Sequence, residues 1–529
     1  MIDPDHVGHP GRATISARPR ALCHTRSASA TTDVQGVGAE RLAADAVAPR
    51  RSTAQPIVAA VATCFLAACP GPRNPGGAAG IAPVTLEIGR PGSSLTGVAG
   101  DGAIVFAALT ARTTGAAAAA AVATTAAVGG TPGAPTAMPP VSKSSTATAG
   151  ATSVTEPTTI IEALRPAAGA APIWRAELAG YGGPIALADR QLLAAIGGTG
   201  SAAGLALRGE PGAVVAALDA ATGAAAWTLA VDATDWAVIE AVASTSGGAV
   251  IGGTFSGTLR IADKVVSSAG HTDGFAARLT ATGGVAWLIR VGGPGADAVH
   301  GVAAAGDRIA IAGTFTAGAD LLGEPLAPFD DRSPRGDGFV AELDPDGTRR
   351  WVQSFGGKAD DAVAGVAIDA AGRIAVAATL QGTVRVGPVE LVASGPADGM
   401  VGWWGPGGSA LQAVRVGGDD FDGLRAIARA GERIVVAGFY SGAIRLGDRT
   451  LTAGGGDDAF VTALDATGTV AQSWSVGGDG REEVTALAEV PGGFVAGIAH
   501  TATARVDDAP LPAPADPMSG AAIAVRPVR

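Results

Sequence analysis

Acidic side chains recur at regular intervals in the second half of the sequence, and they are the first residues to consider for chemistry. One set lies just ahead of a repeated apolar run and comprises Asp297, Asp361, Asp422 and Glu482. A second set opens another apolar run and comprises Asp273, Asp337, Asp398 and Asp458. Carboxylates gathered in a ring can hold a cation or repel anions. Aspartate also accepts backbone N–H bonds in turns, and an acid that recurs in every unit favours this structural role.

Other groups of residues that support catalysis are sparse in this sequence. Of six histidines, three lie in the repeated region, at His271, His300 and His500, each in a different repeat, and we expect them in exposed loops or strands. No HExxH motif accompanies them, and no cysteine follows Cys69 to complete a metal site. A G-x-S-x-G elbow, a P-loop and a strand-linked GxGxxG are also missing. We therefore predict no catalytic residue, no metal site and no cofactor.

The three cysteines all fall in the first 69 residues, so the repeated region holds no disulfide framework. Before the last of them an apolar run extends over residues 57–68, preceded by Arg50 and Arg51. This run has about half the length that a bilayer-spanning helix needs. A basic start followed by a short apolar run is typical of an export signal, and we assign residues 47–68 to a signal peptide. Residues 1–46 then form a disordered extension or a mis-assigned start, since export signals ordinarily begin the chain.

The end of this signal, "LAAC" at residues 66–69, resembles the lipobox of bacterial lipoproteins. The resemblance implies cleavage between Ala68 and Cys69, with diacylglycerol on the cysteine sulfur and an acyl group on its new amino group. Several acyl chains suffice for stable membrane attachment. Pro70 stands in place of the aspartate of an inner-membrane retention signal, which favours an exported protein anchored in the outer membrane or at the cell surface. A Pro- and Gly-rich linker over residues 69–83 leads to the repeated region.

The overall composition limits the function classes. Lys and Arg total 37 against 48 Asp and Glu, which gives a formal net charge of -11. Nucleic-acid binding is excluded because phosphate recognition needs a basic surface. With 79 glycines and 33 prolines the chain is rich in turns, and it shows no helical periodicity.

A tryptophan recurs about every sixty residues and marks a repeating unit. The copies are Trp174, Trp227, Trp287 and Trp351, each four residues ahead of an apolar side chain. Gln412 and Gln472 hold the same place in two further copies. Because the aromatic rings recur with the units, we interpret them as packing between sheets.

Each unit contains four short runs that are typical of strands, named A to D in chain order. In the unit around residue 310 they are "ADAVHGVAAA", "DRIAIAGTF", "DGFVAELD" and "RRWVQSFG", with short turns between A and B and between C and D. Large and small apolar residues alternate in B, which suits a sheet covered on both faces. B and C runs each occur seven times, but only six D runs follow a C run. The run "VTLEIG" at residues 84–89 supplies the missing seventh.

These counts predict an all-β, seven-bladed β-propeller of four-stranded antiparallel blades over residues 84–529, in which the N-terminal strand completes the C-terminal blade. We expect this propeller to be monomeric. Residues 110–157, rich in Ala, Thr, Ser, Gly and Pro, form a low-complexity loop insertion between B and C of the first unit. The B-to-C and D-to-A connections share one face of a propeller, which also carries the recurring acids. That face is where we expect a partner to bind.

The unit resembles the SBBP repeat of seven-bladed propellers in bacterial exported proteins, as seen in "DGFVAELDPDGTRRW" and "GDDAFVTALDATG". The stretch "ALDAATGAAAW" at residues 217–227 resembles the tryptophan-docking motif of quinoprotein propellers. The chain also resembles the propeller lipoprotein of the outer-membrane barrel-assembly machinery. The SBBP, lipobox and barrel-assembly resemblances imply a lipid-anchored, non-catalytic binding or assembly scaffold whose partner is an envelope protein or glycan. The quinoprotein resemblance implies the alternative, an oxidoreductase that uses PQQ with calcium.

Overall fold

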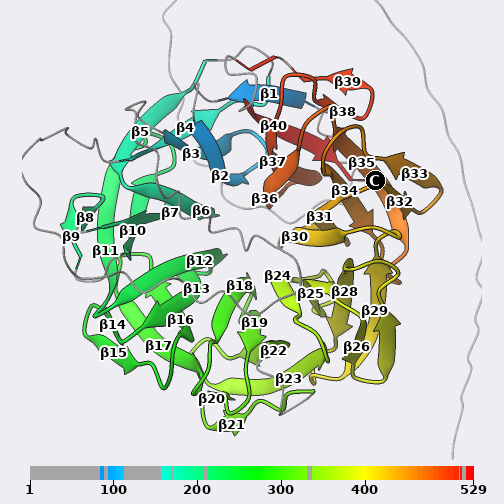
Figure 1. Ribbon diagram of the computed structural model, residues 1–529. Helices are drawn as coiled ribbons and strands as arrows, with labels where there is room; N and C mark the ends of the chain where they lie inside the picture. The colour runs from blue at the N-terminus through cyan, green and yellow to red at the C-terminus, as the bar shows by residue number, and fades with distance from the viewer. Residues whose placement is uncertain are drawn as a thin grey trace, which may run out of the picture. The chain divides into compact units, whose positions relative to one another are not determined.

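The computed structural model describes residues 84–88, 93–111, 157–167, 171–199, 201–207, 211–329, 336–511, 513–514 and 520–528. Over these residues every regular element is a β-strand, as the sequence predicts. The strands form seven antiparallel blades of a propeller (Figure 1). The assigned signal peptide, Cys69, the linker and most of the 110–157 insertion lie outside the described residues. No helix in the described ranges is long and apolar enough to cross a membrane.

The first four blades follow the A-B-C-D order from the inner to the outer strand. Blade 1 consists of β2 (Ser93–Gly100), β3 (Val105–Ala111), β4 (Thr158–Leu164) and β5 (Trp174–Ala179). Blade 2 consists of β6 (Tyr181–Ala188), β7 (Gln191–Gly198), β10 (Gly212–Asp219) and β11 (Ala225–Ala233). Blade 3 consists of β12 (Trp236–Thr245), β13 (Gly248–Ser256), β16 (Asp273–Thr280) and β17 (Val285–Gly292). Blade 4 consists of β18 (Ala298–Ala305), β19 (Arg308–Phe315), β22 (Asp337–Leu343) and β23 (Arg349–Gly357).

The last three blades keep the same order. Blade 5 consists of β24 (Ala362–Ile368), β25 (Ile374–Leu380), β28 (Asp398–Trp404) and β29 (Ala410–Val416). Blade 6 consists of β30 (Asp422–Ala430), β31 (Arg433–Tyr440), β34 (Asp458–Leu464) and β35 (Val470–Gly477). Blade 7 consists of β36 (Glu483–Val490), β37 (Gly493–His500), β40 (Gly520–Pro527) and β1 (Val84–Ile88). The A strands lie innermost, and each contacts the A strand of the next blade around the whole ring (Figure 1).

Blade 7 confirms the predicted closure, because its outer strand comes from the other end of the chain. Thr85 pairs with Ala524 and Ile88 with Ala521 in an antiparallel register. Arg526 of β40 makes two further hydrogen bonds to β1, from Nη1 to the Val84 carbonyl at 2.9 Å and from Nη2 to Thr85 Oγ1 at 3.0 Å. The pairing covers the edge that β40 would otherwise present to solvent.

The structure adds a feature to the predicted four-stranded unit, a two-stranded hairpin between B and C. Six of these hairpins fall in the described residues: β8 (Ser201–Ala202) with β9 (Leu205–Ala206), β14 (Thr258–Ile261) with β15 (Lys264–Ser267), β20 (Asp320–Leu321) with β21 (Glu324–Pro325), β26 (Thr383–Val386) with β27 (Val389–Val392), β32 (Ala443–Leu446) with β33 (Arg449–Thr452), and β38 (Arg505–Val506) with β39 (Ala509–Pro510). Strands β14, β20, β26 and β38 pair with the D strand of the preceding blade. These connections therefore cover part of an outer edge and tie neighbouring blades together.

The hydrophobic core lies between the blades. In β19 the large Ile309 and Ile311 and the small Ala310 and Ala312 are all at most 2% exposed, so both faces of the strand are covered as predicted. Aromatic rings of adjacent strands add edge-on contacts, such as the 69° pair formed by Phe315 and Phe339.

Candidate functional site

The eight recurring acids are buried at the joints between blades, with at most 4% of each residue exposed. They meet in four pairs, each joining the first residue of a C strand to the residue before, or at the start of, the next A strand. The pairs are Asp273 with Asp297, Asp337 with Asp361, Asp398 with Asp422, and Asp458 with Glu482. At the first pair, a Cβ placed on Gly292 would lie 2.7 Å from Asp273 Oδ1 and 2.9 Å from Asp297 Oδ2. Glycine at that position leaves room for the two carboxyl groups.

These carboxyl groups accept backbone hydrogen bonds of the kind expected for a structural role. Asp297 accepts the N–H of Gly293 at 2.7 Å and that of Thr316 at 2.6 Å. Asp422 accepts the N–H of Gly418 at 2.5 Å and that of Ser441 at 3.2 Å. In both cases one donor lies in the turn that enters the A strand and the other lies just after the B strand. The acid therefore joins two connections on one face of the propeller.

The four pairs differ in the residue that the neighbouring D strand places beside them. Arg290 and Arg415 donate to Asp273 and Asp398 at 2.9 and 2.8 Å. In blades 4 and 6 the equivalent residues are Ser354 and Ser475. Each pairs with the phenylalanine of its C strand, as Arg290 does in blade 3. At this register position two pairs thus have a serine where the other two have an arginine.

The pKa values follow this electrostatic setting. Burial and the neighbouring Asp337 carboxylate raise the pKa of Asp361 to about 8. Burial raises the pKa of Asp422 to about 6, with help from Asp398. Burial and the adjacent Glu482 raise the pKa of Asp458 to about 6. A second carboxyl group in the same buried site raises a pKa because ionising both would bury two like charges.

A second set of residues, which the sequence reasoning missed, lies on the innermost strands. Each A strand contains a β-bulge near its start, and the extra residue stands at the inner end of a joint. We call these residues the inner ring: Thr96, Gly183, Pro184, Glu240, His300, Ala364, Arg425 and Thr485. All are half-buried. A bulge redirects a side chain without ending the strand, and bulges are over-represented next to functional sites.

A repeated sequence pattern marks the positions of the inner ring. In six blades the bulge residue stands between an aliphatic residue and Gly or Ala, as in "LTGV", "IEAV", "VHGV", "VAGV", "LRAI" and "VTAL". The neighbours are nearly constant while the residue between them changes from one unit to the next. The inner ring therefore breaks the internal symmetry that the acid pairs maintain.

Glu240 and His300 of the inner ring meet across the joint between blades 3 and 4. His300 Nδ1 lies 2.5 Å from Glu240 Oε2, and His300 Nε2 lies 2.9 Å from Thr314 Oγ1. Thr254 Oγ1 donates to Glu240 Oε1 at 2.5 Å. Burial acts to lower the pKa of His300, but the charge and hydrogen bond of Glu240 outweigh it and raise that pKa above its ordinary value. Burial acts to raise the pKa of Glu240, and His300 with Thr254 brings it below its ordinary value.

The chain from Thr314 through His300 to Glu240 has the connectivity of a nucleophile, a base and an orienting acid. Comparison among the blades gives the hydroxyl a simpler role. Thr110 and Thr379 hold the same place on their B strands and accept N–H bonds from the next A strand, at Gly182 and Leu424 respectively. Threonine here links blades even where no histidine is present, so we assign no catalytic role to Thr314.

The histidines differ in exposure, and Arg425 of the inner ring has its own contacts. The expected exposure holds for His271. It is wrong for His500, which is 3% exposed with its Nδ1 2.9 Å from the Thr501 carbonyl oxygen, and for the half-buried His300. Arg425 lies with its Nε 3.9 Å from Glu483 Oε1 and its guanidinium 4.8 Å from the centroid of the Phe439 ring. The inner ring therefore carries charge of both signs.

The recurring tryptophans lie at the opposite end of the joints, near the A-to-B and C-to-D turns. Trp174, Trp227, Trp287 and Trp351 donate from Nε1 to turn carbonyls of the next blade, at Ala220, Ala281, Pro345 and Pro406 respectively. Gln412 donates from its amide to the equivalent carbonyl of Ala466 at 3.2 Å, which explains how glutamine replaces tryptophan. A turn glycine with positive φ lies against each indole ring, for example Gly347 against Trp287. The docking contact predicted at one stretch thus recurs around the propeller.

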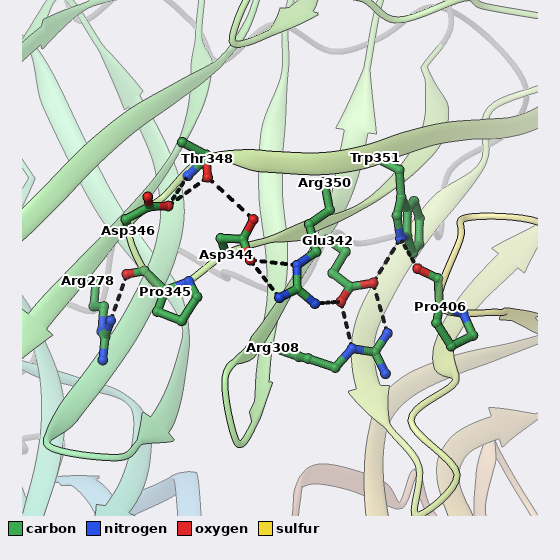
Figure 2. Close-up of polar contacts among 10 residues, drawn as sticks. All are labelled: Arg278, Arg308, Glu342, Asp344, Pro345, Asp346, Thr348, Arg350, Trp351 and Pro406. Carbon is green, nitrogen blue, oxygen red and sulfur yellow. Dashed lines mark hydrogen bonds and ion pairs between the residues drawn. The ribbon is translucent and has the colours of Figure 1, made fainter.

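Figure 2 shows the polar contacts in one such region. Glu342, fully buried, accepts hydrogen bonds from Arg308, Arg350 and the Trp351 indole. Arg278 donates to the Pro345 carbonyl, which also accepts the Trp287 indole. Neighbouring blades are held together here by charged hydrogen bonds as well as by apolar packing.

The described residues do not fit the calcium that the quinoprotein resemblance implies. Calcium takes about six to eight oxygen ligands. Across the part of the chain that the structure describes, no three His, Cys, Asp or Glu side chains come together as metal ligands. The acid pairs supply two carboxyl groups each and already accept backbone N–H bonds.

Comparisons with known proteins bear on the fold. No protein-family model matches this sequence, and no curated protein matches it. The fold is similar to BamB from Moraxella catarrhalis, at 14% identity over 70% of this chain and 79% of that chain, with a TM-score of 0.31. It is also similar to the quinohemoprotein alcohol dehydrogenase of Comamonas testosteroni, at 12% identity over 69% and 71% of the two chains, with a TM-score of 0.32. The endosialidase of phage phi92 is 8% identical over 84% of this chain and 69% of that chain, with a TM-score of 0.36. What this chain shares with all three is limited to the fold.

Proposed function

We propose that this chain is a non-catalytic binding or assembly scaffold of the bacterial cell envelope. In this proposal the signal peptide is cleaved between Ala68 and Cys69, and acyl groups on Cys69 hold the propeller at the outer membrane or the cell surface. Its partner is an envelope protein or glycan that contacts the inner ring and the connections beside it.

The observation that carries the proposal is the inner ring. The strands, acid pairs and docking contacts recur from blade to blade, as expected of parts that maintain the fold. The inner-ring residues differ between blades and include an acid, a histidine and an arginine, namely Glu240, His300 and Arg425. A ligand recognises one arrangement of groups, so a binding site on a repeat protein lies where the repeats differ. Half-buried polar side chains with charges of both signs suit a polar partner.

Affinity capture from envelope extract with matched variants tests the binding role. The native propeller, an Arg425→Gln variant and an Arg385→Gln variant serve as baits after chemical crosslinking. Arg385 lies on the outer hairpin β26, where its ion pair with Glu390 is more than half exposed, so its variant is the control. We expect the same partner with the native and Arg385→Gln baits and a strong loss with Arg425→Gln. Equal recovery with all three would contradict recognition by the inner ring.

Metabolic labelling with a fatty acid tests the anchor separately. We expect label on the native chain and none on a Cys69→Ala variant, with the unprocessed signal retained. Label that persists in the variant would refute acylation at this residue.

A further inference from the structure

A cavity of about 180 Å³ lies at the joint between blades 2 and 3. Its walls are largely apolar and include Leu193, Trp227 and Leu279, and Gly248 also lines it. We call it the joint cavity. Its volume is several times the share of about 30 Å³ that one water occupies in the liquid, so a group the size of a side chain fits.

The cavity lies where neighbouring joints carry large side chains. Ala217 pairs with Trp227 across its sheet, and the residues in the same position opposite the docking residue of later blades are Arg278, Glu342 and Trp403. These larger side chains reach into their own joints, as Figure 2 shows for Arg278 and Glu342. In blade 2 the methyl group of Ala217 leaves the equivalent space open.

A glycine lines the cavity on the side of blade 3. Gly248 is the first residue of strand β13. Its φ is 156°, and a Cβ placed there would clash with the carbonyl oxygen of Leu279. No side chain from this position can fill the cavity.

At the joint between blades 3 and 4, the side chain of Arg278 fills the space that corresponds to the joint cavity. Arg278 donates from Nη1 to the Pro345 carbonyl at 2.7 Å and from Nη2 to the Ser246 carbonyl at 3.4 Å. One of these carbonyls has a counterpart at the joint cavity, since Ala281 accepts the Trp227 indole as Pro345 accepts that of Trp287. Asp189 lines the cavity in the two-residue turn before the B strand, but the positive φ of 53° at Asp189 differs from the turn of Ser246, where Gly247 has the positive φ of 74°. The Ala281 acceptor is thus repeated without the arginine that uses it in the next joint.

We propose that the joint cavity binds a guanidinium group supplied by a ligand, either free arginine-like molecules or the arginine side chain of a partner. A guanidinium is planar and weakly hydrated, donates in a fixed fork and stacks on aromatic faces, so it suits a cavity lined by the Ala281 carbonyl, the acidic Asp189 and the Trp227 indole. The attached methylene groups match the wall formed by Leu193 and Leu279. Of the charged residues that line the cavity, Asp189 attracts the cation and Arg190 opposes it. Gln191 adds a neutral polar group at the cavity.

The joint between blades 6 and 7 has similarly small residues and provides a comparison for the joint cavity. Ala463 and Gly493 repeat the small pair between blades 6 and 7, where Gln472 stands in place of the docking tryptophan. An ion pair of Arg429 with Glu489, at 3.0 Å, also lies at that end of the joint. The docking indole is thus missing there, although Trp474 and Phe494 pack together elsewhere in the same joint. Because of the missing indole and the ion pair, we expect no guanidinium binding at that joint.

Calorimetric titration and thermal unfolding of the whole propeller test the proposal. The probes are N-acetyl-arginine amide, free arginine and N-acetyl-lysine amide. We expect the blocked arginine to bind and raise the unfolding temperature, and the lysine analogue to bind at least about tenfold more weakly, since a compact ammonium lacks the planar fork. Tighter binding of the blocked form indicates a partner's side chain, whereas tighter binding of free arginine indicates a small molecule.

An Ala217→Arg variant supplies the matched test, because it places the chain's own guanidinium in the cavity. We expect this variant to unfold at a higher temperature than the native chain and to lose at least about tenfold in affinity for the arginine probe. An Ala463→Arg variant is the control and should bind the probe as the native chain does. Equal binding of the arginine and lysine probes, or native affinity in a folded Ala217→Arg variant, would overturn the assignment. If Ala217→Arg does not fold, a Trp227→Phe variant should weaken binding, and unchanged affinity there would count equally against the site.

Discussion

Replacing Asp361 by Asn should make the propeller more stable at alkaline pH and leave it nearly unchanged in acid. Asp361 is 4% exposed, and burial together with the nearby Asp337 carboxyl group raises its pKa. It accepts the Gly357 N–H at 3.0 Å, a bond that the asparagine oxygen can retain. Asparagine is neutral at every pH, so it mimics the protonated form of Asp361.

The magnitude follows from the raised pKa. In the unfolded chain the pKa of an aspartate is about 3.9, whereas in the folded chain burial and Asp337 raise that of Asp361 to about 8. Between these values the folded state binds a proton that the unfolded state has released, so the stability that this group contributes falls as pH rises. The slope is about 1.4 kcal/mol per pH unit, and the loss reaches about 5 kcal/mol at pH 8 and then levels off. Below about pH 4 the contribution is fully present.

Equilibrium urea unfolding of the native chain and the variant, in steps between pH 5 and pH 9, provides the assay. The acids outside this pair contribute equally to both proteins, so the difference in unfolding free energy reports the titration of the Asp337–Asp361 pair. We expect this difference to grow steadily up to about pH 8. An Asp422→Asn variant is the matched control, because burial and Asp398 raise the pKa of Asp422 only to about 6 and its difference should level off near that pH. A difference at residue 361 that does not change with pH would refute the raised pKa of Asp361.

Three further predictions concern the docking contacts, the closure and the quinoprotein alternative. Trp287 is 8% exposed, and a Trp287→Phe substitution removes its donor to the Pro345 carbonyl. This variant should lose roughly 1–3 kcal/mol of unfolding free energy in urea. A loss below about 0.5 kcal/mol would argue against the contact. Deletion of residues 84–88 removes the buried Leu86 and Ile88 and exposes the edge of β40. The shortened chain should therefore unfold at a lower temperature and aggregate. Deletion of residues 1–46 is the control and should have neither effect. Addition of PQQ with calcium should give no stoichiometric absorbance of a bound cofactor, and the appearance of such a signal would overturn the non-catalytic proposal.

Much of the fold was predictable because its signals are local. The alternation of large and small residues in "RIAIAGTF" specifies a strand covered on both faces, and the short turns specify its antiparallel neighbours. The number of blades followed from counting such runs, and the missing seventh D strand predicted the pairing of residues 84–88 with β40. The additional hairpins escaped this reasoning, although "TLRI" and "AIRL" show the alternation of a strand. Their pairing with the preceding blade is a long-range contact that no local pattern specifies.

The candidate sites depended on contacts between blades. The sequence determined which residues recur, and so it identified the acids and the tryptophans as groups that maintain each unit. Only the tertiary structure decided that Asp337 lies near enough to Asp361 to raise its pKa, that bulges bring Glu240 to His300, and that a cavity remains at the joint between blades 2 and 3. The physical reason is that charge, burial and empty volume arise between side chains distant in the chain, whereas strand and turn preferences arise within a few neighbouring residues.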